Sequence, residues 1–251
     1  MIRNDIKRLV VVDYRNTPVG IMTQKDVVRG LVKGNVKPLQ EIPIKPFITK
    51  DPISLEASSD VKKAVQIMVS KDISSIVVVD KIGKITGIVT KTDIAHYLSD
   101  ISEADMPVKR FMSKDPVTIG EYHSIFAAAH VMSERGFTRL IVVNDKGKPI
   151  GITTLSDLVS VGAVLPSQDR TTSMAVVVKG ALIPSRMLPM LLVRNVMTAD
   201  PFTINQSADV TEAARLMIKH GISGLPVVDE KGRLAGIITK TDLVKAVAKI
   251  K

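Results

Sequence analysis

The sequence contains no cysteine and no tryptophan, and aromatic residues make up only 3% of it. Without cysteine the chain has no disulfide, no thiolate metal site and no cysteine nucleophile. The hydrophobic content of 45% is nevertheless sufficient for a folded core. We therefore predict aliphatic cores of Val, Ile, Leu, Met and Ala, in a chain whose 251 residues suit one large domain or two of ordinary size.

Long apolar runs are also missing. The most apolar stretch, residues 175–193, is interrupted by two prolines and two basic residues. A helix that spans a bilayer needs roughly 20 mostly apolar residues in a row. The first five residues contain no apolar segment of the kind found in signal peptides. We expect a soluble, cytoplasmic protein that does not associate with membranes.

Catalytic and metal-binding motifs are not recognisable. The sequence has no Gly-x-Ser-x-Gly nucleophile motif and no Gly-x-x-x-x-Gly-Lys-Ser/Thr phosphate loop. His123 and His130 are expected on one helix, about 10 Å apart along its axis, which is too far for them to share a metal ion. We predict a protein that is not an enzyme, binds no metal through its side chains and requires no cofactor.

The positive charge is concentrated in part of the chain. The net charge is +10, and residues 1–50 carry ten Lys/Arg against four Asp/Glu. A basic region of this kind can attract phosphate-bearing partners, so a nucleic-acid-associated protein is one hypothesis. We do not favour it, because aromatic stacking residues are scarce and no helix-turn-helix or zinc-finger motif is recognisable.

Four copies of one seven-residue pattern, Gly-apolar-x-Thr-x-x-Asp, occur along the sequence. They occupy residues 20–26, 87–93, 151–157 and 236–242. In the last three copies an Asp-Pro pair begins 42 residues before the closing Asp, at Asp51, Asp115 and Asp200. Each copy has a residue that tolerates the positive φ of a tight hairpin ten residues before the closing Asp, namely Asn16, Gly83, Gly147 and Gly232. Four copies in one register indicate a repeated unit, and we number them repeats 1 to 4.

Each complete repeat predicts a β-α-β-β-α unit of the mixed α/β (α+β) class. In repeat 2 we expect a strand at 53–55, a helix containing Ala64 to Val69, strands at 76–79 and 85–89, and a second helix that starts near Asp93. Thr and Asp at the junction between the last strand and the second helix suit helix-capping positions. A unit of roughly 50 to 60 residues buries little surface, so we expect the units to pair.

Two regions depart from this regular frame. Projecting the 42-residue offset back from Asp26 places the first Asp-Pro pair before residue 1, so we expect repeat 1 to lack its first strand and half its first helix. Residues 163–192 are an insertion between repeats 3 and 4, with a predicted strand at 174–178 and an apolar patch at 187–192. We favour a linker for this insertion, and an element that contacts a partner or a second copy is the alternative.

The stretch from His220 to Asp229, Gly-Ile-Ser-Gly-Leu-Pro-Val-Val at its centre, followed by residues 236–242, resembles the signature of the CBS (cystathionine β-synthase) domain family. The resemblance covers nearly the whole chain except about 163–192. It implies four tandem repeats that form two paired, Bateman-type modules in a disc-like assembly. The implied domains are partial repeat 1 (1–36) with repeat 2 (45–103), and repeat 3 (107–162) with repeat 4 (193–251).

The resemblance also implies ligands and the residues that hold them. The family often binds AMP, ADP, ATP or S-adenosylmethionine in clefts between paired repeats. The implied ribose ligands are the closing carboxylates Asp26, Asp93, Asp157 and Asp242. The implied ribose or phosphate contacts are Thr23, Thr90, Thr154 and Thr239. The residues before the central strands, Ser74, Thr138 and Ser223, are implied to line the clefts, and Arg139 and Arg8 are implied to meet a phosphate.

These assignments agree with simple physical chemistry, but each residue also has an alternative role that involves no ligand. A carboxylate can accept hydrogen bonds from both ribose hydroxyls, and a helix N-terminus favours a nearby phosphate. The same Thr and Asp residues can equally be helix caps, Arg139 can be a surface cation, and the clefts of a structural scaffold can be empty. We expect a regulatory ligand sensor in which two clefts are occupied, which relays binding to a protein partner or within a homodimer.

Overall fold

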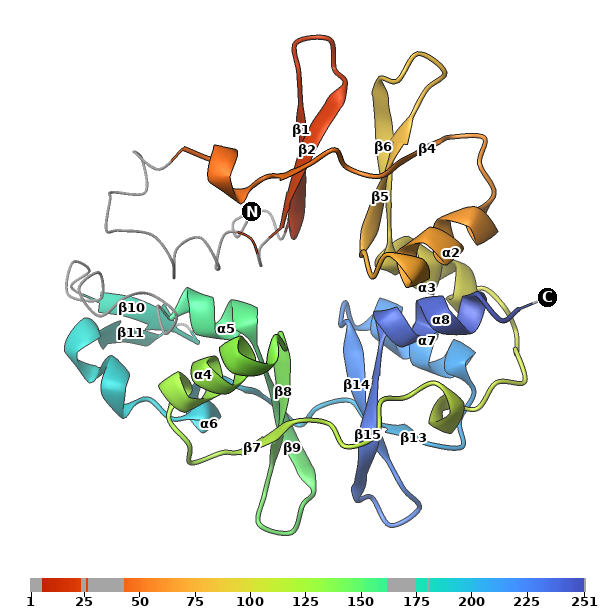
Figure 1. Ribbon diagram of the computed structural model, residues 1–251. Coiled ribbons are helices and arrows are strands. Elements are labelled where there is room, and N and C mark those ends of the chain that lie inside the picture. The colour runs from red at the N-terminus through yellow and green to blue at the C-terminus, as the bar shows by residue number, and fades with distance from the viewer. Residues whose placement is uncertain (1–5, 24–25, 27–42, 162–174, 180, 251) are drawn as a thin grey trace.

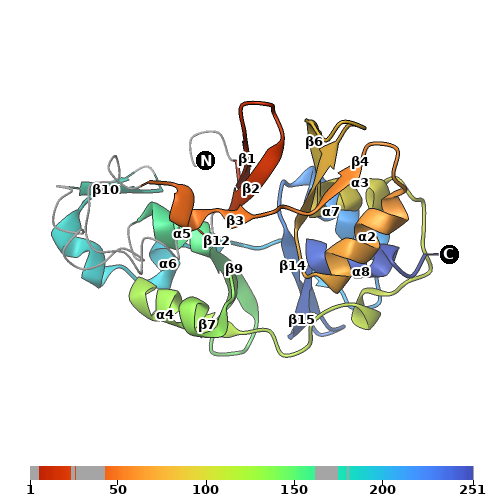
Figure 2. The ribbon, with the colours of Figure 1, turned by 45° about the horizontal axis from the view of Figure 1, so that its top comes forward.

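The computed structural model describes residues 6–23, 26, 43–161, 175–179 and 181–250. The four repeats surround a common centre, and the hairpins of repeats 1 and 2 point away from those of repeats 3 and 4 (Figure 1). In a second view, turned about the horizontal axis, β1 and β2 again lie beside β6, and β9 again lies on the same side of the molecule as β14 and β15 (Figure 2). The predicted mixed α and β class is confirmed.

The predicted β-α-β-β-α order is present in repeats 2, 3 and 4. Repeat 2 contains β4 (Ser54–Glu56), α2 (Val61–Ser70), β5 (Ser75–Val79), β6 (Ile85–Thr90) and α3 (Lys91–Ser99). Repeat 3 contains β7 (Thr118–Gly120), α4 (Ile125–Arg135), β8 (Arg139–Val143), β9 (Pro149–Thr154) and α5 (Leu155–Ser160). Repeat 4 contains β13 (Ile204–Asn205), α7 (Val210–Lys219), β14 (Gly224–Val228), β15 (Leu234–Thr239) and α8 (Lys240–Val247).

Repeat 1 contributes the hairpin of β1 (Arg8–Val12) and β2 (Pro18–Thr23). The helix expected at the start of this repeat, and the second helix expected near Asp26, lie outside the described residues apart from Asp26 itself. The hairpin turns of all four repeats adopt the predicted left-handed backbone, with φ of 65° at Asn16, 81° at Gly83, 70° at Gly147 and 72° at Gly232. The prediction that His123 shares a helix with His130 is wrong, because Ser124 is the N-cap of α4 and His123 precedes it.

Short segments that lead into one repeat pair with the sheet of another. β3 (Thr49–Lys50) runs antiparallel to β2, and β12 (Thr198–Ala199) runs antiparallel to β9. Ser113 makes the equivalent bridge to Ile237 of β15. We call residues 48–50, 112–114 and 197–199 the lead-in segments. They place the start of repeat 2 on repeat 1, and they connect repeats 3 and 4 in both directions.

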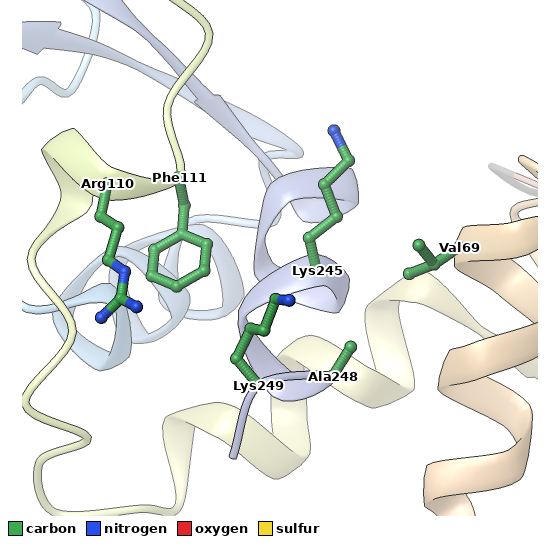
Figure 3. Close-up of a pocket in the computed structure, with 6 residues that line it drawn as sticks. All are labelled: Val69, Arg110, Phe111, Lys245, Ala248 and Lys249. Carbon is green, nitrogen blue, oxygen red and sulfur yellow. The ribbon is translucent and has the colours of Figure 1, made fainter.

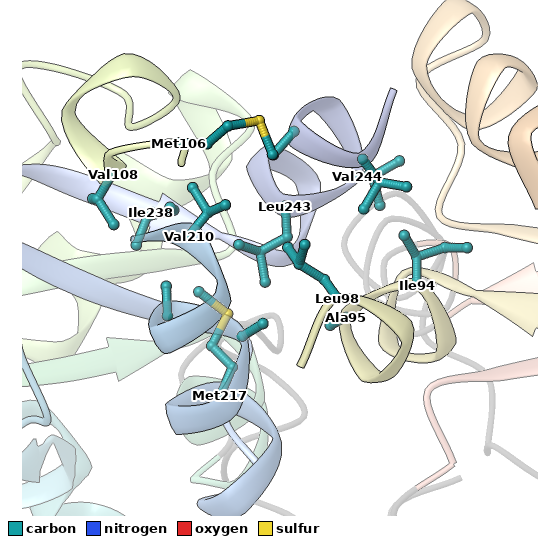
Figure 4. Close-up of a cluster of buried hydrophobic side chains, with 14 of the residues drawn as sticks. Ile94, Ala95, Leu98, Met106, Val108, Val210, Met217, Ile238, Leu243 and Val244 are labelled. Atoms are coloured by element: carbon teal, nitrogen blue, oxygen red, sulfur yellow. The ribbon is translucent and has the colours of Figure 1, made fainter. Parts of the chain in front are cut away.

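The largest hydrophobic core joins the helices of repeats 2 and 4. α3 packs against α7 and α8, and fully buried Leu98, Met217 and Leu243 meet at this contact (Figure 4). Burying a side chain of this size stabilises the fold by about 1.5–3 kcal/mol. A second core lies in repeat 3, where Ile125 and Met132 of α4 pack with Val193 of α6 (Val193–Val196). The helices therefore join the half that contains repeats 1 and 2 to the half that contains repeats 3 and 4. The lead-in segments join repeat 1 to repeat 2 and repeat 3 to repeat 4.

The insertion between repeats 3 and 4 contains a two-stranded antiparallel hairpin. Its strands are β10 (Ala175–Val178) and β11 (Ala181–Pro184), so the predicted strand is confirmed over its described residues. The 3-10 helix η6 (Ser185–Met190) follows; it buries Leu188 and leaves Met187 and Met190 exposed. The other short 3-10 helices are η3 (Lys45–Phe47) and η4 (Val108–Arg110). No helix in the described part of the chain is long and apolar enough to cross a membrane.

Candidate functional site

The Thr and closing Asp of each repeat form a helix-capping pair. In repeat 2 the backbone N–H and the hydroxyl of Thr90 both donate to Oδ2 of Asp93, at 2.7 and 2.8 Å. The pairs in the other repeats have the same geometry, with distances of 2.6 to 2.9 Å; they are Thr23–Asp26, Thr154–Asp157 and Thr239–Asp242. In repeats 2, 3 and 4, where the second helix is described, helix capping therefore uses Oδ2 of the closing Asp, and a ligand would have to bind Oδ1.

The residues before the central strands lie at the same junctions. The carbonyl oxygen of Ser74 accepts a hydrogen bond from the backbone N–H of Lys91, at 3.2 Å. Thr138 accepts from Leu155 at 2.8 Å, and Ser223 accepts from Lys240 at 3.2 Å. In each of these repeats the backbone thus brings the candidate Ser or Thr next to the capping Thr and Asp.

The two candidate arginines reach across to the neighbouring repeat. Arg8, at the start of β1, donates from Nη1 to the carbonyl oxygen of Ser74 in repeat 2, at 2.5 Å. Arg139, at the start of β8, donates from Nη2 to Oγ of Ser223 in repeat 4, at 2.7 Å. A side chain at Gly224 would overlap Nη1 of Arg139, so this glycine makes room for the guanidinium. From the sequence each arginine is expected beside the candidate site of its own repeat. In the structure each arginine instead lies beside the candidate site of the next repeat.

Two lysines that the sequence analysis missed connect repeats 2 and 4. Nζ of Lys91 donates to the hydroxyl of Thr241 at 3.0 Å, and Nζ of Lys240 donates to the hydroxyl of Thr92 at 3.1 Å. Burial lowers the pKa of both lysines below its ordinary value. A signal was available in the sequence, because only repeats 2 and 4 have Lys-Thr-Asp at the end of the seven-residue pattern.

We call Arg8, Lys91, Asp93, Arg139, Lys240 and Asp242 the central cluster. Burial lowers the pKa of Arg8 and of Arg139. The negative charge of Asp93 acts to raise the pKa of Arg8, and that of Asp242 acts to raise the pKa of Arg139. Lys91 and Lys240 are each affected by a carboxylate of the opposite half, Asp242 and Asp93. The cluster contains four cations and two carboxylates, and its cations are partly removed from water. An anion bound here would reduce the repulsion among the cations.

The closing carboxylates differ in accessibility. Asp93 is exposed, and Asp26 and Asp157 are half-buried. Asp242 is only 3% exposed, and its Oδ1 lies 3.3 Å from Nζ of Lys245. Of the two carboxylates beside an arginine, Asp93 is therefore open to a ligand in this structure, and Asp242 is covered.

A separate pocket of about 410 Å³ lies at the junction of repeats 2 and 4 (Figure 3). Its lining comes from α2, from η4 and the residue after it, and from α8 and the two residues after it: Val69, Arg110, Phe111, Lys245, Ala248 and Lys249. None of the predicted site residues lines it. Among the described residues, no three His, Asp or Glu side chains lie close enough together to hold a metal ion.

Comparison with known families decides the classification. The model of the CBS domain matches four stretches of the sequence, residues 1–33, 44–100, 108–163 and 193–249. The chain belongs to the CBS domain family. The four matches confirm the tandem CBS repeats that the seven-residue pattern indicated.

The relatives of this CBS chain include archaeal proteins. Protein MJ1404 of Methanocaldococcus jannaschii is 34% identical over 175 residues, which cover 69% of this chain and 40% of that protein. The match thus spans less than half of that relative's length. The crystal structure of protein MJ1225 from the same organism has a TM-score of 0.77 at 24% identity and covers 99% of this chain and 90% of that one. A conserved protein of Pyrococcus horikoshii has a TM-score of 0.69 at 23% identity, with coverages of 97% and 92%.

Proposed function

We propose that this CBS protein is a non-catalytic regulatory protein that binds an adenine nucleotide between paired repeats. The central cluster is the observation that carries the proposal, because its excess positive charge suits a phosphate group. The same charge disfavours S-adenosylmethionine, which carries a cationic sulfonium, so we place AMP, ADP and ATP ahead of it. The proposal includes the pairing of repeat 1 with repeat 2 and of repeat 3 with repeat 4.

The site beside Asp93 is the better of the two candidates. The exposed carboxylate of Asp93 can accept hydrogen bonds from the ribose hydroxyls through the oxygen that does not cap α3. Arg8 from repeat 1 and Lys240 from repeat 4 provide cations next to it. The N-terminus of α3, a helix of nine residues, adds its own attraction for a phosphate.

The second candidate site, beside Asp242, has matching groups in Arg139 and Lys91, but Asp242 must be uncovered before a ligand can reach its carboxylate. Lys245 has to leave Oδ1 of Asp242 for a ribose to bind there. We therefore expect the site beside Asp93 to fill first.

The lysines provide a route from ligand binding to a change in the whole molecule. A phosphate that draws Lys240 toward Asp93 competes with the hydrogen bond from Lys240 to Thr92. The reciprocal bond from Lys91 to Thr241 responds in the same way to a ligand at the second site. Ligand binding shifts the two halves only if the ligand prefers one arrangement over the other. A partner protein that contacts both halves would then sense the ligand.

Calorimetric titration with AMP, ATP, adenosine and S-adenosylmethionine tests this function. We expect Arg8→Met and Lys240→Met each to weaken AMP binding about tenfold, equivalent to about 1.4 kcal/mol, with little effect on adenosine. Arg135→Met, at the exposed end of α4, is the matched control and should leave binding unchanged. The proposal fails if no adenosine ligand binds more tightly than millimolar, or if Arg8→Met and Arg135→Met behave alike. Binding of nucleic acid with steep salt dependence would instead favour the alternative function.

A further inference from the structure

The pocket at the junction of repeats 2 and 4 has an apolar surface. Phe111 and Ala248 are half-buried and pack against the largest hydrophobic core, and the exposed side chain of Val69 adds a third apolar group. In Figure 3 Arg110 and Phe111 lie on one side of Lys249, and Val69 lies on the other. The volume of about 410 Å³ is in the range of small-molecule sites. The pocket can therefore hold the apolar body of a small molecule.

The charged residues of this pocket are all cations. Its lining includes Arg110, Lys245 and Lys249, and none of its described lining residues is Asp or Glu. Of these three cations, only Lys245 has a carboxylate partner in the described part of the chain, Asp242 at 3.3 Å. Arg110 and Lys249 are exposed. Cations that lie near one another without counter-charges attract an anion.

Arg110 lies where it can hold the anionic group of such a molecule. Its guanidinium carbon is 5.9 Å from the centre of the Phe111 ring. An aromatic or aliphatic body that rests on Phe111 therefore brings an attached carboxylate or phosphate beside the guanidinium. A guanidinium can donate two parallel hydrogen bonds to an oxyanion of either kind, and the ammonium of Lys249 provides a second cation. The pocket thus offers contacts for an oxyanion and for an apolar body at the same time.

We infer that this pocket is a binding site for a small organic anion, namely a carboxylate or phosphate on an aromatic or branched aliphatic body. The body lies against Phe111, Ala248 and Val69, and Arg110 and Lys249 hold the oxyanion. An inorganic anion contacts only the cations, and a neutral apolar molecule contacts only the apolar surface, so each of them binds more weakly. No residue of the central cluster lines the pocket, so this site is separate from the proposed nucleotide sites.

Lys245 connects the pocket with the candidate nucleotide site beside Asp242. Its Nζ lies 3.3 Å from Oδ1 of Asp242, and its side chain is 53% exposed, so it can turn toward the pocket. An anion in the pocket competes with Asp242 for this ammonium and favours the arrangement in which Oδ1 is uncovered. This consequence rests on the proposed function. The pocket ligand should strengthen binding of the second nucleotide, and that nucleotide should strengthen binding of the pocket ligand by the same factor.

Methyl NMR of the full chain tests the pocket directly, with phenyl phosphate as the probe. The alanine and valine methyl groups are labelled, and the resonances of Val69 and Ala248 are followed during the titration. We expect saturable shifts of both, and binding about tenfold weaker for inorganic phosphate and for benzyl alcohol. Arg110→Met and Lys249→Met should each weaken phenyl phosphate about tenfold, because each removes a charge-assisted hydrogen bond. Lys109→Met removes a neighbouring exposed cation that does not line the pocket, so this matched control should bind normally.

Three results would overturn the inference. The first is that the Val69 and Ala248 methyl resonances do not shift with millimolar phenyl phosphate or phenylacetate. The second is that Arg110→Met and Lys109→Met weaken binding equally. The third is that Arg8→Met abolishes binding while Arg110→Met leaves it intact, which would assign the anion to the central cluster. Binding of either probe at the two methyls supports the inference, and the tighter probe shows whether phosphate or carboxylate is preferred.

The connection through Lys245 is tested by native mass spectrometry of AMP additions with and without saturating phenylacetate. We expect phenylacetate to strengthen the second addition about fivefold, and Lys245→Met to remove this effect. A second addition that phenylacetate leaves unchanged would refute the connection and leave the pocket in place. If no AMP adds to a chain whose Val69 and Ala248 methyls respond to phenylacetate, the proposed function fails and the pocket site stands.

Discussion

Alanine substitutions at two equivalent glycines should have very different effects on stability. In Gly236→Ala the new Cβ would lie 2.6 Å from the carbonyl oxygen of Ser113, which is closer than real contacts allow. The lead-in segment must move back by several tenths of an ångström. Such overpacking typically costs about 1–3 kcal/mol. It also strains the two hydrogen bonds between Ser113 and Ile237, each of which contributes about 0.5–1.5 kcal/mol.

We therefore expect Gly236→Ala to lower the free energy of unfolding by about 2–4 kcal/mol. Gly87→Ala meets no described atom within 4 Å and has no left-handed φ. It should leave stability unchanged or raise it by about 0.4–1 kcal/mol, because alanine has fewer conformations in the unfolded chain. Urea denaturation followed by circular dichroism measures both values. Equal effects at the two positions, within about 0.5 kcal/mol, would refute the reasoning from close approach.

Three other predictions concern single residues. Thr153→Val should stabilise the protein by about 1 kcal/mol, measured by urea denaturation. The hydroxyl of Thr153 is fully buried and has no hydrogen-bond partner among the described atoms. A loss of stability would show that this hydroxyl has a partner. Burial acts to raise the pKa of Asp209, but backbone N–H donors, including that of Met106, hold it below its ordinary value. The stability that this carboxylate contributes is thus present above about pH 4 and is lost as pH falls through the lower, folded pKa. Asp209→Asn should lower the free energy of unfolding by about 1 kcal/mol at pH 7 and by much less at pH 2, which melting curves at the two pH values would show. The same loss at both pH values would contradict the pKa argument. Gly224→Ala should displace Arg139 and weaken ATP binding at the second site, beside Asp242, as strongly as Arg139→Met does. Calorimetry measures both losses, and unequal losses would show that the guanidinium can move aside.

Much of the architecture could be predicted because the repeat places the same local signals in one register. Asn16 and the three hairpin glycines are needed for left-handed turns, and they mark those turns in the structure. Alternating apolar residues and capping Thr-Asp pairs mark the strands and the starts of the second helices. These are short-range effects, so a sequence pattern carries them directly.

The arrangement of the site could not be predicted in the same way, because it depends on contacts between repeats. Lys91 and Lys240 look like surface residues until the helices of repeats 2 and 4 meet. Asp93 and Asp242 occupy the same position of the pattern, yet only Asp242 is covered, by Lys245 among others. The glycines before them are equally alike in sequence, but among the described residues a neighbouring segment lies against Gly236 and none lies against Gly87.

The central claim, that an adenine nucleotide binds beside the central cluster, is tested most directly by native mass spectrometry of the purified chain titrated with AMP and ATP. We predict that one nucleotide adds first and a second adds at higher concentration, and that Arg8→Met weakens the first addition about tenfold without weakening the second. A chain that stays free of nucleotide at millimolar concentration, or one whose first addition is unchanged by Arg8→Met, would contradict the account.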